Sequence, residues 1–195
     1  MVARYVVEHF NHLGIVAEVC REIGVVRVCA GVEAQEEMQM GGKAVQLVSI
    51  HDHAAERNFL GFDLSDVLDS LGERMWAWEW CITYLDAFGF AVEDLCQKVE
   101  ASRPKGVWLS SDDIIQVASR IQRTIDGTFL AFPKGDDYSA MPSAEVSLQF
   151  FAASRAQLAI QAVDSTYFLV YAKSPLDLQR IRRRFRDVRR EDAIQ

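Results

Sequence analysis

An alternating aromatic row near the middle of the chain constrains the fold more than any other feature. Within MWAWEWCITYL, residues 75–85, every second position is large and apolar: Trp76, Trp78, Trp80, Ile82 and Tyr84. Successive side chains of a strand point to opposite faces, so the row predicts a strand with one buried face. The other face, with Glu79 and Thr83, is expected to meet solvent.

Such a row can also stack bases or sugars. We favour core packing, because each buried ring contributes roughly 2–3 kcal/mol of apolar transfer free energy.

Helices and strands are expected to mix along the chain without a regular β–α–β alternation. Apolar residues at helical spacing predict helices over 8–23, 64–71, 93–101, from Ser110 or Ser111 to Gly127, and from Ser174–Pro175 to Val188. Strands are predicted over 25–29, 43–50, 128–132, 157–163 and 166–172, and residues 146–151 fit either element. The pattern favours an α+β fold: a mostly antiparallel sheet with helices packed on one face, preceded by an N-terminal helix.

A polar stretch divides the chain into two expected parts. Residues 30–42, AGVEAQEEMQMGG, end in two glycines and are typical of a linker. We therefore expect an N-terminal helical segment and linker over 1–40 and an α+β domain over 41–195. Half of the 195 residues are hydrophobic, which is enough for a sizeable core. No apolar run reaches the ~18 residues of a membrane span, and a cytoplasmic location is expected.

The four cysteines, at positions 20, 29, 81 and 96, form no C-x-x-C pair. The spacing of zinc ribbons, thioredoxins and iron–sulfur proteins is therefore missing. Free thiols in a reducing compartment are expected.

Charge is unevenly distributed along the chain. Seven arginines and three acidic residues give the last 16 residues a charge of +4, whereas residues 1–179 carry −11, for a total of −7. Five arginines form the candidate binding surface: Arg180, Arg182, Arg183, Arg184 and Arg186. They could pack along an acidic surface of this chain or of a second subunit, or contact nucleic-acid phosphate. We favour the first hypothesis, because the acidic remainder of the chain repels phosphate.

His51 and His53 are the candidate metal ligands. In a strand, residues 51 and 53 point to the same side, and imidazoles commonly bind metal ions. A third ligand would be needed, for which Glu56 and Asp63 are candidates. The alternative is a solvated turn after a strand, which we favour.

No common enzyme signature occurs in the sequence. The motifs G-x-x-x-x-G-K-[ST], G-x-G-x-x-G, G-x-S-x-G and H-E-x-x-H are all missing. This favours a non-catalytic role, and we expect no cofactor.

The segment VEHFNHLGIVAEVCREIGVV, residues 7–26, resembles the opening of certain bacterial insertion-sequence transposases, a small domain of unknown function. The matching positions are His12, Leu13, Gly14, Ile15, Val16, Cys20, Ile23 and Gly24. The resemblance implies a bacterial origin and adds weight to nucleic-acid association. The resemblance covers about 20 residues, and it assigns no catalytic residue to this chain. Residues 60–187 resemble only small uncharacterised bacterial proteins.

Together these features predict a cytoplasmic, non-catalytic binding or assembly module that uses its arginine-rich C-terminal helix. The expected partner is another protein or a second copy of the chain in a homodimer, and not a membrane. A nucleic-acid-associated factor is the first alternative. A metal-dependent enzyme centred on His51 and His53 is the second.

Overall fold

The computed structural model describes strands 6–10, 15–20 and 25–28 and residues 45–52, 60–135 and 146–191. The chain divides into two units, Met1–Gly42 and Lys43–Gln195. The first unit contains a three-stranded antiparallel sheet in the order β1-β2-β3, made of β1 (Val6–Phe10), β2 (Ile15–Cys20) and β3 (Val25–Val28).

Within residues 8–23, where we expected a helix, the described residues 8–10 and 15–20 belong to β1 and β2, and the helix is not confirmed. Residues 11–14 and 21–24 lie outside the described residues. Valine and isoleucine are frequent in these strands, and a branched Cβ favours extended backbone. This preference opposes the helical spacing of the apolar residues.

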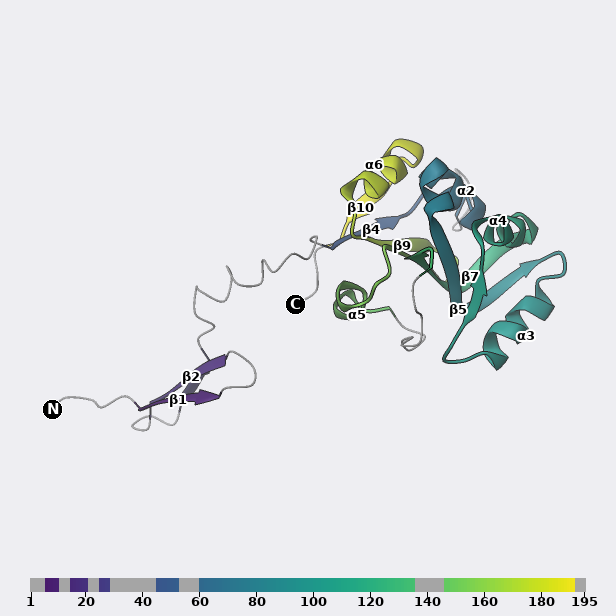
Figure 1. Cartoon of the computed structure of the whole chain (residues 1–195). Coiled ribbons are helices and arrows are strands. Elements are labelled where there is room, and N and C mark those ends of the chain that lie inside the picture. Colours follow the sequence, from purple (N-terminus) through teal and green to yellow (C-terminus); the bar gives the residue numbers. More distant parts are fainter. Residues whose placement is uncertain are drawn as a thin grey trace. The chain divides into compact units, whose positions relative to one another are not determined.

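The second unit is built on a seven-stranded sheet in which every pair of neighbours is antiparallel, as the expected α+β fold requires (Figure 1). Its order is β10-β4-β9-β8-β7-β5-β6. The strands are β4 (Gln46–Ile50), β5 (Trp78–Gly89), β6 (Val107–Leu109), β7 (Ile121–Pro133), β8 (Leu158–Val163), β9 (Tyr167–Ala172) and β10 (Val188–Arg190). The helices are α2 (Leu64–Leu71), the 3-10 helix η1 (Gly72–Ala77), α3 (Glu93–Ala101), α4 (Ser111–Arg120), α5 (Leu148–Ala153) and α6 (Pro175–Arg184).

Helices lie on both faces of this sheet, so the prediction of one covered face is only partly confirmed. Figure 1 shows α2, α4 and α6 along one face and α5 on the other. Phe151 of α5 packs in a second core cluster with Cys81 and Leu130. Cys81 and Thr83 are 0% and 3% exposed, so the prediction that this face of the strand meets solvent was wrong. Apolar side chains on both faces of the central strands require cover on both sides.

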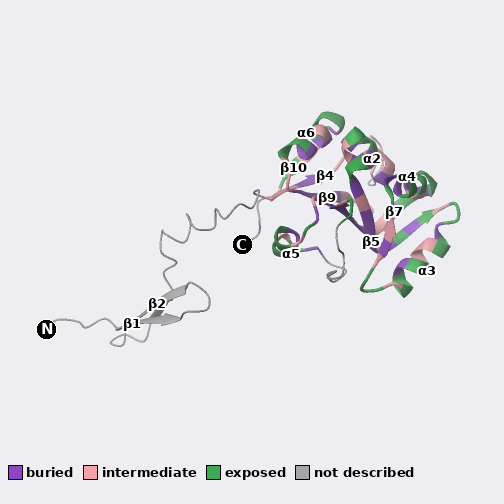
Figure 2. Ribbon diagram, in the orientation of Figure 1, coloured by how far each residue is buried: buried purple, intermediate pink, exposed green. Residues whose placement is uncertain are grey.

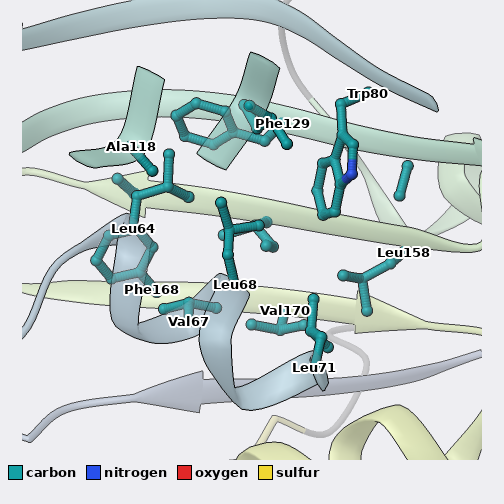
Figure 3. Packing of buried hydrophobic residues seen from close by; sticks show 14 of the residues in the cluster. Leu64, Val67, Leu68, Leu71, Trp80, Ala118, Phe129, Leu158, Phe168 and Val170 are labelled. Carbon is teal, nitrogen blue, oxygen red and sulfur yellow. The ribbon is translucent and has the colours of Figure 1, made fainter. Parts of the chain in front are cut away.

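The main core lies between the sheet and α2. The α2 side chains Leu64, Val67, Leu68 and Leu71 point toward the sheet (Figure 3). They meet Trp80 of β5 and Phe129 of β7, among others. Asp63 caps this helix and, with Asp66, forms a capping box. The face and the start of α2 are those predicted from the sequence.

The indole row is buried only in part. Trp78, Trp80 and Ile82 are buried, but Trp76 is 45% exposed because it lies in η1, before the strand begins. A bulge between Ile82 and Tyr84 then interrupts the alternation.

Two element boundaries differ from the prediction. Helix α4 ends at Arg120, and Ile121 begins the long strand β7 that pairs with β5 and β8. Helix α6 ends at Arg184, and Val188 begins β10. In both places a β-branched residue enters a sheet ladder, which stabilises extended backbone more than continued helix would. Among the described residues, no helix is both long and apolar enough to cross a membrane.

Candidate functional site

Helix α6 carries four of the five predicted site arginines. Pro175 at its first turn has the fixed φ that suits a helix start. Leu178 and Ile181 are both 0% exposed and bury one side of the helix in the main core. Figure 2 shows the outer side of α6 exposed. This packing turns the remaining side chains toward α2 or solvent.

An ion pair with a buried carboxylate fixes the start of α6. The Asp177 side chain is fully buried and accepts hydrogen bonds from Arg74 Nε at 2.9 Å and from Arg74 Nη2 at 3.2 Å. Arg74 belongs to η1 and also lies over the ring of Trp78, 5.4 Å from its centroid. A bidentate pair of this kind holds both groups in a defined geometry. Neither residue is among the predicted site residues, because no local spacing relates positions 74 and 177.

Two of the five predicted arginines bind α2 rather than a partner. Arg184 Nη2 lies 2.8 Å from Asp66 Oδ1, and Arg180 Nη1 donates to the Leu71 carbonyl at 2.5 Å. The second contact adds a charged side-chain donor to a carbonyl at the C-terminal end of α2. Arg180 and Arg184 therefore hold two helices of the same chain together.

The other three arginines, Arg182, Arg183 and Arg186, are exposed. Within the described part of the chain, no side chain forms a hydrogen bond or an ion pair with their guanidinium groups. We call these three residues the arginine surface. They are the part of the predicted site that is available to another molecule.

The turn after α6 positions Arg186. Asp52 Oδ2 accepts the Arg186 backbone N–H at 2.9 Å, and the same carboxylate accepts the Asp187 N–H. His51 N–H donates to the Asp187 carbonyl at 2.9 Å, and β10 then pairs with β4. Backbone N–H donors thus tie the turn after α6 to the end of β4, and the Asp52 carboxylate accepts two of these hydrogen bonds.

An ion pair between Asp187 and Arg189 follows this turn. Arg189 Nη2 and Nε donate to the two carboxylate oxygens of Asp187, at 2.7 and 2.9 Å. These side-chain hydrogen bonds, together with the charge of Asp187, raise the pKa of Arg189.

His51, the first predicted metal ligand, lies in a hydrogen-bonded network on β4. Its Nε2 is 2.8 Å from Ser49 Oγ, and the Ser49 hydroxyl donates to Glu191. The ring stacks on Tyr167 with 5.1 Å between centroids. Because the Ser49 hydroxyl donates to Glu191, it accepts from a protonated Nε2 of His51.

The second predicted ligand, His53, lies outside the described residues. Across 45–52, 60–135 and 146–191, no three His, Cys, Asp or Glu side chains gather in a way that could hold a metal ion. Metal binding at His51 and His53 stays a prediction.

A surface pocket of about 620 Å³ brings His51 together with two of the predicted arginines. Its lining includes His51, Arg184 and Arg186, with Asp52 and Asp66 supplying negative charge. Phe62 and Phe185 form its apolar wall, with ring centroids 4.7 Å apart. The sequence predicted the arginines and the histidine separately, and only the pairing of β10 with β4 makes them neighbours.

Comparisons with known proteins add no assignment: no family model, curated protein or solved structure matches the chain. The resemblance of residues 7–26 to insertion-sequence transposases stays a prediction.

Proposed function

We propose that the chain is a non-catalytic binding or assembly module whose arginine surface contacts an acidic surface of a protein partner. The supporting observation is that Arg182, Arg183 and Arg186 are exposed without a partner among the described side chains, on an element that is firmly held. Arginine is enriched in protein interfaces, because its planar fork binds carboxylates in pairs.

The scaffold under the arginine surface favours such a role. The buried side of α6 packs in the core, and Asp177 and Arg184 tie the helix to η1 and α2. A guanidinium on a fixed element loses less conformational freedom on binding than one on a mobile tail. The arginine surface is therefore preorganised for a contact.

Nucleic acid is the second candidate, because phosphate also binds arginine. Asp52, Asp66 and Asp187 lie among the arginines and lower the positive potential that a phosphate backbone would meet. Protein carboxylates arranged around these charges fit the surface better than a uniformly charged duplex does.

Fluorescence anisotropy with two labelled probes tests the proposal: a glutamate-rich peptide and a DNA duplex of similar charge. We expect the peptide to bind and its affinity to fall at least tenfold in the variant with Arg182, Arg183 and Arg186 all changed to Ala. The matched control changes Lys105, Lys134 and Arg155 to Ala, which removes the same number of exposed charges elsewhere. We expect this control to bind as the wild type does.

The salt dependence separates the two partner classes. Binding of the duplex that exceeds that of the peptide, and that weakens steeply with salt, would replace our proposal with the nucleic-acid function. A peptide affinity that is equal in the arginine variant and the matched control would remove the arginine surface from the mechanism.

A further inference from the structure

The strongest apolar surface of the described residues lies away from the arginine surface, at the turn after β5. Phe88 and Phe90 are 64% and 79% exposed, the two highest values among the large hydrophobic residues. They stand two residues apart, one at the end of β5 and one in the turn that leads to α3. Two exposed phenyl rings this close in the chain are typical of a contact site.

The turn that carries Phe90 is held in place. The Phe90 N–H donates to the Arg120 carbonyl at 3.0 Å. At Gly89 the backbone runs so close to α4 that an added Cβ would lie 2.0 Å from the Arg120 oxygen. The aromatic side chains are therefore presented by a backbone that is fixed against the junction of α4 and β7.

An apolar groove lies beside this turn. It has a volume of about 330 Å³ and runs between α3 and α4. Ala91, Leu95 and Val117 contribute apolar wall, Lys98 and Arg120 contribute positive charge, and Asp94 contributes negative charge. Among the described residues, no acidic side chain forms an ion pair with Lys98 or Arg120.

The charges around the turn are self-complementary. The exposed acidic residues Asp86, Glu93 and Asp94 stand near the same turn as the exposed cations Lys98 and Arg120. A two-fold symmetric interface needs one patch that carries both halves of each contact. This patch has a projecting aromatic turn, an apolar groove and both signs of charge, which is what a second copy of the chain would match.

We propose that this turn forms a homodimer contact, in which Phe90, supported by Phe88, enters the groove between α3 and α4 of a second copy. The acidic residues of one copy then face Lys98 and Arg120 of the other. This contact is independent of the arginine surface, and it would give the module two separate binding faces.

The exposed area predicts a weak dimer. Two rings exposed to these fractions offer about 290 Å² per copy, so two copies offer about 580 Å², roughly half of the ~1,200 Å² in total at which specific interfaces begin. The groove walls and the ion pairs must supply the rest. We expect dissociation in the micromolar range, on the order of 10–100 μM.

Sedimentation velocity over a wide range of protein concentration tests the proposal on the full chain. We expect the wild type to shift from monomer to dimer, and the variant Phe90→Asp to raise the dissociation constant at least tenfold. Leu176→Asp is the matched control, because Leu176 is 59% exposed on α6 and lies outside the patch. We expect the control to dimerise as the wild type does.

Further variants keep the test decisive. Phe90→Ser replaces the ring without adding charge, and Lys98→Glu reverses a groove charge; both should weaken the dimer, with circular dichroism confirming that they are folded. A wild type that is monomeric at every concentration overturns the proposal. So does a dimer that survives Phe90→Asp, or one that is lost only when Arg182, Arg183 and Arg186 are replaced. Monomeric protein that binds lipid vesicles through Phe88 and Phe90 would assign the patch to a membrane surface instead.

Discussion

Both oxygens of the buried Asp177 carboxylate accept hydrogen bonds from a single guanidinium, that of Arg74, at 2.9 and 3.2 Å. This pair joins the 3-10 helix after α2 to the first turn of α6. The arginine surface therefore depends on a residue 103 positions earlier in the chain.

Arg74→Ala should destabilise the protein by about 2 kcal/mol, because it leaves a buried carboxylate without its cation. The value lies below that of a fully buried pair, since the Arg74 side chain is 39% exposed and water reaches part of it. Urea unfolding followed by circular dichroism measures the change. Arg74→Met keeps the apolar stem and should cost nearly as much if the lost charge is the cause.

Arg103→Ala is the control for this experiment. Arg103 pairs with Glu100 at 2.9 Å, but both side chains are more than a third exposed. Such surface pairs contribute about 0–1 kcal/mol. Equal losses for Arg74→Ala and Arg103→Ala would show that the Asp177 pair adds no more than a surface contact.

Cys81 should make stability fall at high pH. Burial raises the pKa of this thiol to about 12 in the folded protein, whereas an exposed thiol ionises at about 8.5. The unfolded chain loses this proton first, so the contribution of Cys81 is complete below the unfolded pKa. It is then lost as the pH rises toward the folded pKa.

Urea unfolding at a series of pH values from neutral to alkaline measures this effect. Cys81→Ala removes the thiol, so its stability should depend less on pH in the alkaline range than that of the wild type. Burial also raises the pKa of Tyr171, which acts in the same direction and remains in both proteins. Parallel curves for the two proteins would show that Cys81 ionises normally in the folded state.

Gly106→Ala should destabilise the fold by about 3 kcal/mol or more, because it adds both backbone strain and a clash. Gly106 has φ +70°, and an added Cβ would lie 2.5 Å from the Cys81 sulfur and 2.8 Å from the Ile82 oxygen. Thermal unfolding measures the loss.

Gly135→Ala separates the two causes. Gly135 has φ +79°, but apart from its chain neighbours no atom of the described residues lies within 4 Å of the position that an added Cβ would take. Only the strain of a positive φ remains there, which costs about 1 kcal/mol. If both variants lose the same stability, close packing at Gly106 is not the cause.

Several elements could be predicted because their signals are local. Asp63 and the Leu64–Leu71 stripe predicted α2, and its capping box is formed by residues three positions apart. The stretches on either side of Asp164 are rich in β-branched and aromatic residues, and they predicted β8 and β9 joined by a tight turn. Asp164 and Ser165 both have a positive φ in that turn. Caps, stripes and turns use neighbours in the chain, so the sequence contains the whole signal.

Other boundaries were missed because sheet pairing decides them. Residues 121–125 have helical spacing, yet they form the start of β7, where Ile121 and Arg123 pair with β5. The short strand β6 exists only because Val107–Leu109 pairs with the middle of β5. Ile82 pairs with Val107, and Phe88 pairs with Arg123. Partners about 20 to 40 positions apart leave no signal in the local periodicity of either segment.

The α+β class, most helix starts and the presence of an arginine-rich end all follow from the order of the amino acids, because propensity, capping and charge belong to single residues or near neighbours. Which of those arginines are used internally depends on the packed molecule. Arg180 and Arg184 meet α2, while Arg182, Arg183 and Arg186 remain exposed. Both groups have the same chemistry. Arg180 and Arg184 differ from Arg182 and Arg183 because Leu178 and Ile181 fix the rotation of α6 against a sheet assembled from distant strands, and Arg186 is placed by the turn that Asp52 holds.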